Sequence, residues 1–201
     1  MKPTVDGEAI PMSERDMGVL RVLEEEELSN FSFEGLKRRV GTHPETLSRV
    51  LSRLEDQNIV ERAEDGYRVT TTGREQLQVH PVAVSAERLT LLKTMLPPNG
   101  NLQTVFANLR GRWFGNLRWL GNSQGGSEVV MKWVTDDGKV QLDARFTPGE
   151  LTIEARLLHG RELASAVRSA HELLAHISRA YARPASRVLL FEASPVPFTP
   201  N

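Results

Sequence analysis

Cysteine is absent from the 201 residues of this chain, so neither a disulfide framework nor a cysteine-based zinc site can form. Long apolar runs are absent as well, since none approaches the roughly 20 residues that a membrane-spanning helix needs. The N-terminal stretch, residues 1–8, lacks the apolar core of a signal peptide. These absences predict a cytoplasmic protein that has no membrane partner.

Catalytic and metal-binding motifs are also missing. The chain has no Gly-x-Ser-x-Gly element, no phosphate-binding loop and no dinucleotide fingerprint. Among its five histidines, His171 and His176 are five residues apart and do not share a helical face, and no carboxylate joins them at ligand spacing. The sequence therefore predicts a protein that is not an enzyme and that holds no metal and no cofactor.

The net charge of −1 is unevenly distributed along the chain. Residues 1–80 contain 11 basic and 16 acidic residues, whereas residues 81–201 contain 14 and 10. Within residues 37–53, five basic residues accompany a single acid. Because phosphate binding depends on local positive charge, this short segment favours contact with nucleic acid more than the total charge does.

Residues 32–41 predict a short helix that ends abruptly. Phe33, Leu36 and Val40 place apolar side chains on one face of this helix. Gly41 ends it, because glycine adopts the left-handed conformation that a helix exit often needs. The chain is therefore expected to turn sharply immediately after Gly41.

A second helix is predicted over residues 43–57. Thr42 is expected to cap it, with Glu45 completing a Thr-x-x-Glu capping box and Pro44 in the first turn. Short polar groups and arginines suit a helix that enters the major groove, where arginine can bind guanine O6 and N7 together. The buried face is expected to consist of Leu47, Val50, Leu51 and Leu54, and the polar face of His43, Glu45, Thr46, Ser48, Arg49, Ser52 and Arg53.

A β-hairpin is predicted immediately after this helix. Residues 59–63 and 67–71 are β-type runs on either side of Asp65-Gly66, a strong hairpin signal. Arg62 and Arg68 flank the tip and could contact phosphates, whereas the tip itself is acidic and would repel DNA. The hairpin is therefore either a DNA-contacting wing or a cover for the core.

Residues 13–78 resemble winged helix-turn-helix transcriptional regulators of the MarR-like and archaeal type. The resemblance rests on the Leu-x-x-Gln-x-Ile-Val exit at residues 54–60 and the Tyr-x-Val-Thr-x-x-Gly element at residues 67–73. It implies a winged-helix fold that binds double-stranded DNA, although the acidic hairpin tip departs from the basic tip of many relatives. The expected DNA-binding residues are Lys37, Arg38, Arg39, Thr42, His43, Glu45, Thr46, Ser48, Arg49, Ser52, Arg53, Arg62 and Arg68.

Composition shifts predict five segments in an α+β protein. The first helix of the winged unit begins at the cap Ser13, and the linker is expected to be a helix over residues 86–96 with Leu89, Leu92 and Leu96 on its apolar face. The segments are a flexible arm at 1–12, a winged helix at 13–80, a linker helix within 81–100, an α+β dimerisation or sensor domain at 101–194 and a tail at 195–201.

The second half predicts an antiparallel meander packed with one long helix. Strands are expected at residues 128–135, 139–147 and 150–158, with a last short strand at 187–192. Apolar and polar residues alternate in 139–147 and 150–158, which predicts a sheet with one wet face. Residues 102–110 fit either a helix or a strand. The long helix is expected over residues 160–182. Its apolar stripe has successive residues 4, 3, 4, 3 and 4 positions apart, namely Leu163, Val167, Ala170, Leu174, Ile177 and Tyr181.

Two Arg-Trp pairs, Arg112-Trp113 and Arg118-Trp119, are the most distinctive feature of the second half. Arginine beside tryptophan can stack on bases or hold an anion. Six residues apart on one strand, the two tryptophans would share a face, which favours a core or a dimer interface over a ligand site.

Together these patterns predict a sequence-specific, duplex DNA-binding transcriptional regulator that reads the major groove with helix 43–57. A single short recognition helix seldom binds tightly enough, so we expect a homodimer, with an unidentified small-molecule effector as a further partner. Two alternatives remain open at this point. The chain could be a protein-interaction adaptor of transcription or chromatin machinery, or a single-strand nucleic-acid binder that uses its C-terminal sheet.

Overall fold

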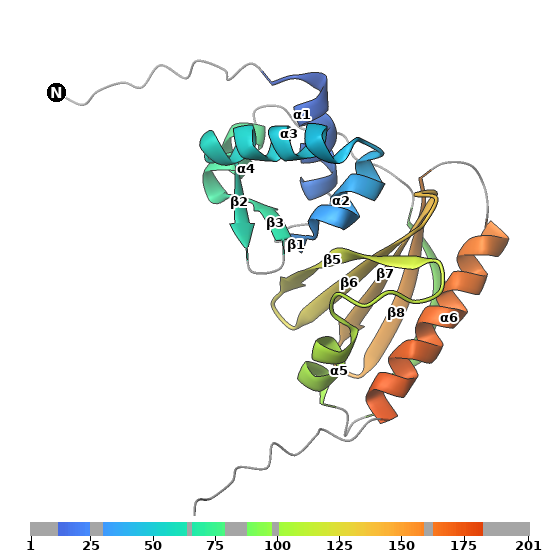
Figure 1. The fold of residues 1–201 in the computed structure, drawn as a ribbon. Helices are drawn as coiled ribbons and strands as arrows, with labels where there is room; N and C mark the ends of the chain where they lie inside the picture. The colour runs from blue at the N-terminus through green and yellow to red at the C-terminus, as the bar shows by residue number, and fades with distance from the viewer. Residues whose placement is uncertain are drawn as a thin grey trace, which may run out of the picture.

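The fold is taken from a computed structural model that describes residues 12–24, 30–63, 66–78, 88–97, 101–158 and 163–182 (Figure 1). Most of the expected arm, the hairpin tip at residues 64–65, the strand expected at 187–192 and the tail lie outside the described residues. The described helices are α1 (Glu14–Glu24), α2 (Phe33–Val40), α3 (Pro44–Asp56), α4 (Thr71–Gln78), α5 (Leu102–Leu109) and α6 (Leu163–Ala182).

One antiparallel sheet contains every strand that the structure describes, in the order β2-β3-β1-β5-β6-β7-β8-β4. The strands are β1 (Asn30–Phe31), β2 (Val60–Ala63), β3 (Gly66–Val69), β4 (Arg88–Met95), β5 (Leu117–Gly125), β6 (Glu128–Thr135), β7 (Val140–Thr147) and β8 (Glu150–Leu157). The predicted α+β class is therefore confirmed, and the strands expected near residues 128, 139 and 150 are present.

The two-residue strand β1 joins the N-terminal part of the chain to the C-terminal part. Phe31 pairs with Tyr67 of β3 on one side and with Gly121 of β5 on the other. The next residue, Ser32, donates its backbone N–H to the carbonyl of Leu120 at 2.8 Å. The hairpin β2–β3 and the meander β5–β8 thus belong to one continuous hydrogen-bonded sheet.

Two hydrophobic cores lie on opposite sides of this sheet. The larger core is enclosed between β4–β8 and the helices α5 and α6, which Figure 1 shows on the same side of the meander. The smaller core gathers α1, α2, α3 and the β2–β3 hairpin. Leu120 of β5 is fully buried in this smaller core, so the C-terminal part supplies one of its residues.

The long helix packs on the sheet as expected, and its predicted stripe is partly correct, since Ala170 and Ile177 are buried and Leu174 and Tyr181 pack against the larger core. The residues it buries are Ala166, Ser169, Ala170, Leu173, Ile177 and Ala180. Leu163 is exposed, and Val167, Leu174 and Tyr181 are only half-buried. Four of these six buried residues have small side chains, which let the helix approach the sheet closely. A search for large apolar residues at helical spacing does not identify a buried face made of small residues.

Part of the second face of the meander is buried, contrary to the expectation that one face is wet, although Arg145, Thr152 and Glu154 on this face are half-buried. Lys132, Gln141, Asp143 and Arg156 project from this face and are almost fully buried. Asp143 lies 3.4 Å from the Lys132 ammonium and 3.3 Å from the Arg156 guanidinium, and it accepts a 2.7 Å hydrogen bond from Gln141. Helix α2 contacts β5 and β6 from this side, and alternation within a strand cannot predict such a partner.

Residues 88–95 form the strand β4 instead of the predicted linker helix. Seven of its residues pair with β8, from Arg88 with Arg156 to Met95 with Glu150. Leu92 and Leu96 are half-buried against the larger core, whereas Leu89 is half-buried without packing on it, and a register irregularity near Leu91 brings Leu91 to the core as well. Leucine fits helix and strand alike, so pairing with the edge of the sheet decides the conformation.

Helix α1 begins as predicted. Ser13 Oγ accepts a hydrogen bond from the Asp16 N–H at 3.2 Å, and Asp16 accepts one in return from the Ser13 N–H at 2.8 Å. This reciprocal capping fixes the start of α1. None of the described helices is both long enough and apolar enough to cross a membrane.

Candidate nucleic-acid interface

A tight turn connects α2 to α3. Gly41 adopts φ = 68° and ψ = 30°, and its N–H donates to the Lys37 carbonyl at 3.0 Å, so the predicted left-handed helix exit is confirmed. At the other end of α2, Ser32 Oγ accepts a 3.1 Å hydrogen bond from the Gly35 N–H. Both ends of this eight-residue helix are thereby fixed by hydrogen bonds.

The expected capping box at the start of α3 does not form. His43, not Thr42, is the N-cap residue, and its side chain makes no capping hydrogen bond. The helix begins at Pro44, so Glu45 falls one position too early to reach back to the cap. Glu45 instead lies 3.9 Å from Arg49, one helical turn away.

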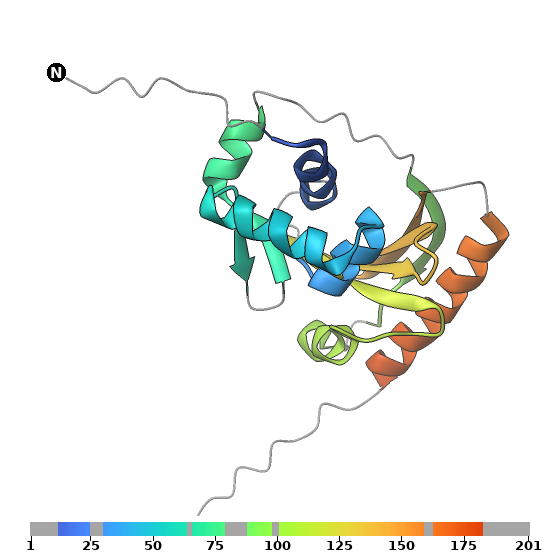
Figure 2. The same ribbon diagram turned by 45° about the horizontal axis from the view of Figure 1, so that its top comes forward.

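Helix α3 divides cleanly into a buried and an open face. The predicted buried residues Leu47, Val50, Leu51 and Leu54 are all in the smaller core. Helix α3 lies along the outside of the N-terminal part, on the side away from β5–β8 (Figure 2). The exposed residues on α3 and at its cap are His43, Pro44, Glu45, Ser48, Arg49, Ser52, Arg53 and Asp56, and Thr42 and Thr46 are half-buried.

The two arginines of α3 differ in their surroundings. The Arg49 side chain is 82% exposed and its nearest acid, Glu45, is almost as open. Arg53 instead forms an ion pair with Asp16 of α1, whose carboxylate is buried. Arg49 can therefore reach a ligand without disturbing the fold, whereas Arg53 also holds α3 against α1.

The basic residues of α2 are only partly available to a ligand. Lys37 lies 2.5 Å from Glu34, and Arg38 lies 3.4 Å from the same carboxylate. Arg39 donates from Nε to the Gln141 side chain at 3.1 Å, so it points at the meander and links α2 to β7. The side chains of Lys37 and Arg38 are 28% and 21% exposed, so both are only partly open to a ligand.

The arginines of the hairpin have partners within the hairpin, and Arg62 also lies 3.7 Å from Glu55 of α3. Arg62 donates to the Tyr67 hydroxyl at 2.6 Å and lies over the Tyr67 ring at 5.2 Å. Arg68 Nε lies 2.5 Å from the Glu61 carboxylate on the neighbouring strand. Both side chains are still substantially exposed, so they could exchange these partners for phosphates.

The two Arg-Trp pairs have different environments. Trp119 lies in the larger core, with its ring 5.3 Å from the Trp133 ring at an angle of 75°, so its predicted core role is confirmed. Trp113 is 58% exposed and does not share that face. The guanidinium carbons of Arg118 and Arg38 lie 4.9 and 5.6 Å from the centre of the Trp113 ring, which brings α2 and the segment before β5 together.

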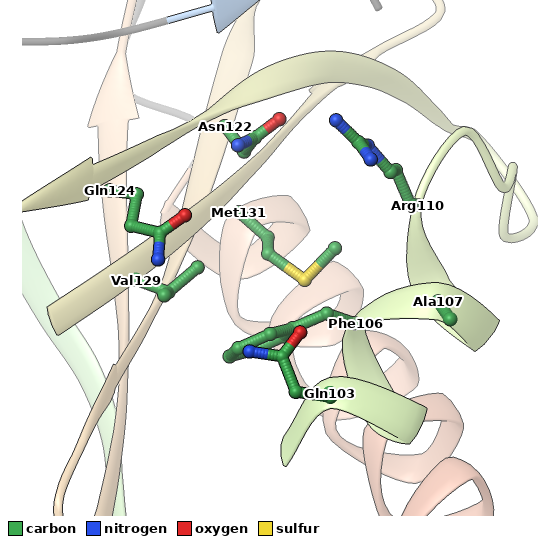
Figure 3. A pocket seen from close by; sticks show the side chains of 8 residues that line it. All are labelled: Gln103, Phe106, Ala107, Arg110, Asn122, Gln124, Val129 and Met131. Carbon is green, nitrogen blue, oxygen red and sulfur yellow. The ribbon is translucent and has the colours of Figure 1, made fainter. Parts of the chain in front are cut away.

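A cavity of about 190 Å³, here called the α5 cavity, lies between α5 and the ends of β5 and β6 (Figure 3). Sequence reasoning missed it, because its walls come from a helix and two strands. One signal was present, since Gln103, Phe106, Ala107 and Arg110 are spaced as one helical face. The sheet contributes Asn122, Gln124, Val129 and Met131.

Among the described residues, no cluster of three or more His, Asp or Glu side chains could hold a metal ion. The open face of α3 and the α5 cavity are candidate ligand-binding surfaces among the described residues. Comparison with protein-family models, with curated proteins and with solved structures finds no match to this chain.

Proposed function

We propose that this chain is a sequence-specific, duplex DNA-binding transcriptional regulator. In this proposal α1–α4 with β1–β3 form a winged helix-turn-helix, α3 reads the major groove, and the β2–β3 hairpin is the wing. The observation that carries it is the division of α3 into a buried leucine face and an open face of short polar and basic side chains. Helix α3 itself lies on the side of the N-terminal part away from β5–β8 (Figure 1).

The dimensions of α3 support this assignment. An α-helix with its side chains is about 10–12 Å wide, and the major groove of B-DNA is about 12 Å wide. Ser48, Arg49 and Ser52 are exposed on α3 and lie within about one helical turn of one another. We assign Arg49 to bidentate binding of a base or a phosphate, and the serines to shorter contacts.

We further propose that the protein acts as a homodimer. Several basic residues near α3 already have acidic partners, so one copy offers little free positive charge, and two half-sites raise the affinity. In the order of the described strands β4 lies at one end of the sheet, and its last residue, Met95, is 76% exposed. A two-fold arrangement would place two α3 helices about 34 Å apart, or a multiple of that distance. Light scattering on the full chain measures the assembly.

The primary test is duplex binding by fluorescence anisotropy at several salt concentrations. Arg49→Ala is expected to weaken binding by about 1–3 kcal/mol if the side chain contacts a base, and to reduce the salt slope by about one if it contacts a phosphate. Arg168→Ala, which removes an exposed arginine from α6, is the matched control and should leave binding unchanged. Equal binding by the wild type and the Arg49 variant would contradict the role of α3.

A second candidate function is a protein-interaction adaptor in transcription or chromatin machinery. The ion pairs that Glu34, Glu45 and Asp16 make with neighbouring basic residues favour it, because they reduce the positive potential around α3. An adaptor would show no steep salt dependence of duplex binding. The single-strand alternative requires exposed bases to stack on the sheet, and the burial of Trp119 favours duplex binding over it.

A further inference from the structure

The α5 cavity interrupts the apolar face that the meander presents to α5 and α6. On β5, Leu117 and Trp119 face the larger core, and after the register shift at Leu120 the residues facing the same side are Asn122 and Gln124. Their partners on β6 remain apolar, since Asn122 pairs with Met131 and Gln124 with Val129. Asn122 is half-buried and Gln124 is exposed, so these carboxamides lie at the open edge of the core, where solvent or a ligand can supply their hydrogen bonds.

The charge of the residues that line the cavity favours a negatively charged ligand. Of the eight described residues that line the cavity, Arg110 alone is charged, and none is acidic. A cationic ligand would therefore find no acidic group in this lining, whereas a carboxylate could accept hydrogen bonds from the guanidinium. Figure 3 shows the Arg110 guanidinium and the Asn122 side chain facing each other at one end of the cavity.

The apolar floor and the small volume of the cavity favour a small ligand with an apolar part. Met131 and Phe106 lie side by side between the two polar ends, with Val129 next to them (Figure 3). At about 190 Å³ the cavity is smaller than the clefts of roughly 300–1,000 Å³ that hold drug-sized ligands. A ligand on the order of ten non-hydrogen atoms would fill it. An inorganic anion would leave the apolar floor uncovered.

We propose that the α5 cavity binds a small organic monocarboxylate. The carboxylate pairs with Arg110, and a short apolar body lies on Phe106 and Met131. Gln103 and Gln124 close the other end of the cavity and accommodate either a terminal methyl group or a neutral polar group. This site is separate from α3, and the proposal stands whether or not α3 binds DNA.

The test uses the full chain labelled with ¹³C at the methionine methyl groups. The chain has five methionines, and the Met131 signal is identified by its loss in Met131→Leu. Hexanoate, an eight-atom probe, is titrated and compared with its neutral isostere hexanamide and with sulfate at matched ionic strength. We expect a saturable shift of the Met131 signal with hexanoate at an affinity on the order of 1 mM, with Met95 unmoved.

Two arginine variants separate a specific site from general attraction to positive charge. Arg110→Gln should weaken hexanoate binding about tenfold or more without changing the weak response to hexanamide. Arg112→Gln removes an exposed arginine two residues away that does not line the cavity, and it should bind hexanoate as the wild type does.

Three results would overturn the proposal. The first is no saturable Met131 shift at about 20 mM hexanoate, roughly twenty times the expected dissociation constant. The second is an equal response to hexanoate and hexanamide, and the third is unchanged hexanoate affinity in the Arg110→Gln variant. A Met131 shift of the same size with sulfate would assign the site to inorganic anions and would equally reject an organic carboxylate. Because the assay contains no DNA, none of these results bears on the proposed role of α3.

Discussion

Arg53 on α3 and Asp16 on α1 form an ion pair that is exposed at one end and buried at the other. The arginine side chain is 46% exposed, whereas the aspartate side chain is 3% exposed. Asp16 also caps its own helix through Ser13, so one carboxylate fixes both the start of α1 and the position of α3. Any loss of DNA binding in an Arg53 variant would therefore mix a lost contact with a displaced helix, and Arg49 is the cleaner probe.

The pH dependence of stability should report this ion pair. Burial raises the pKa of Asp16, but the hydrogen bonds from Arg53 and Ser13 outweigh burial and bring the pKa below its ordinary value of 3.8. The folded state thus binds its proton less readily than the unfolded state. The stabilisation is present above a pH of about 4 and is lost as the pH falls through the lower pKa of the folded state.

We therefore expect Asp16→Asn to lower the free energy of unfolding at neutral pH by about 1–3 kcal/mol. The difference between variant and wild type should shrink below pH ~4. Urea denaturation at both pH values measures it. A difference that stays constant down to pH ~3 would show that the carboxylate charge does not contribute.

The packing of α2 on β5 predicts a large effect of one methyl group. A Cβ added at Gly35 would lie 2.6 Å from the Leu120 Cα and 2.7 Å from its carbonyl oxygen, both backbone atoms that cannot move aside. Gly35→Ala should therefore lower the free energy of unfolding by about 1–3 kcal/mol or more. Gly18→Ala, within α1 where a Cβ meets nothing within 4 Å, is the control and should stabilise the protein by about 0.5–1 kcal/mol. Equal effects would mean that α2 does not pack on β5 as closely as described.

The buried charges of the meander predict a second large effect. Asp143→Ala would remove the carboxylate that lies close to both Lys132 and Arg156 and would leave their charges buried. We expect the free energy of unfolding to fall by about 3–5 kcal/mol. Asp136→Ala, which breaks the more exposed pair with Arg118, should cost at most about 1 kcal/mol in the same denaturation experiment. Similar losses in both variants would argue against burial of the Asp143 cluster.

His176 of α6 should make stability depend on pH just below neutrality. Its ring stacks on Phe114 with centres 4.2 Å apart. Burial lowers the pKa of His176 below 6.5, Arg179 lowers it further, and Glu172 opposes both. The unfolded state therefore takes up a proton first, so the free energy of unfolding falls as the pH drops below about 6.5.

Replacing this histidine should remove that dependence. Thermal unfolding of His176→Phe should lose less stability than the wild type between pH ~7 and pH ~5. His171→Gln changes an exposed histidine on the same helix and should follow the wild type. The prediction is contradicted if the His176 variant and the His171 variant show the same slope.

The sequence predicted the parts of the fold that depend on local patterns. Alternation of apolar and polar residues located β7 and β8, and Gly41 located the exit of α2. The faces of α3 were also correct, because four leucine and valine positions repeat at helical spacing. The capping residue is His43, one position later than predicted. Glu45 therefore pairs with Arg49 and does not complete a capping box.

The errors concern features that depend on contacts distant in the chain. Leu89, Leu92 and Leu96 fit a helix until the edge of β8 offers a strand to pair with. Nothing local to β7 shows that α2 covers its polar side, so Asp143 was expected in water. The α5 cavity depends on the register shift at Leu120, which moves the core-facing positions of β5 from odd to even residues.

The position of Leu120 limits how this protein can be divided or recombined. A cut anywhere in residues 79–87 would strip the smaller core of Leu120 and would leave β1 without its partner β5. Fragments on either side would each carry a bare apolar surface and an unpaired strand edge, the features that promote aggregation. A chimaera that exchanges the N-terminal part alone should therefore be insoluble, and a module that can be transplanted must include the β5–β6 hairpin.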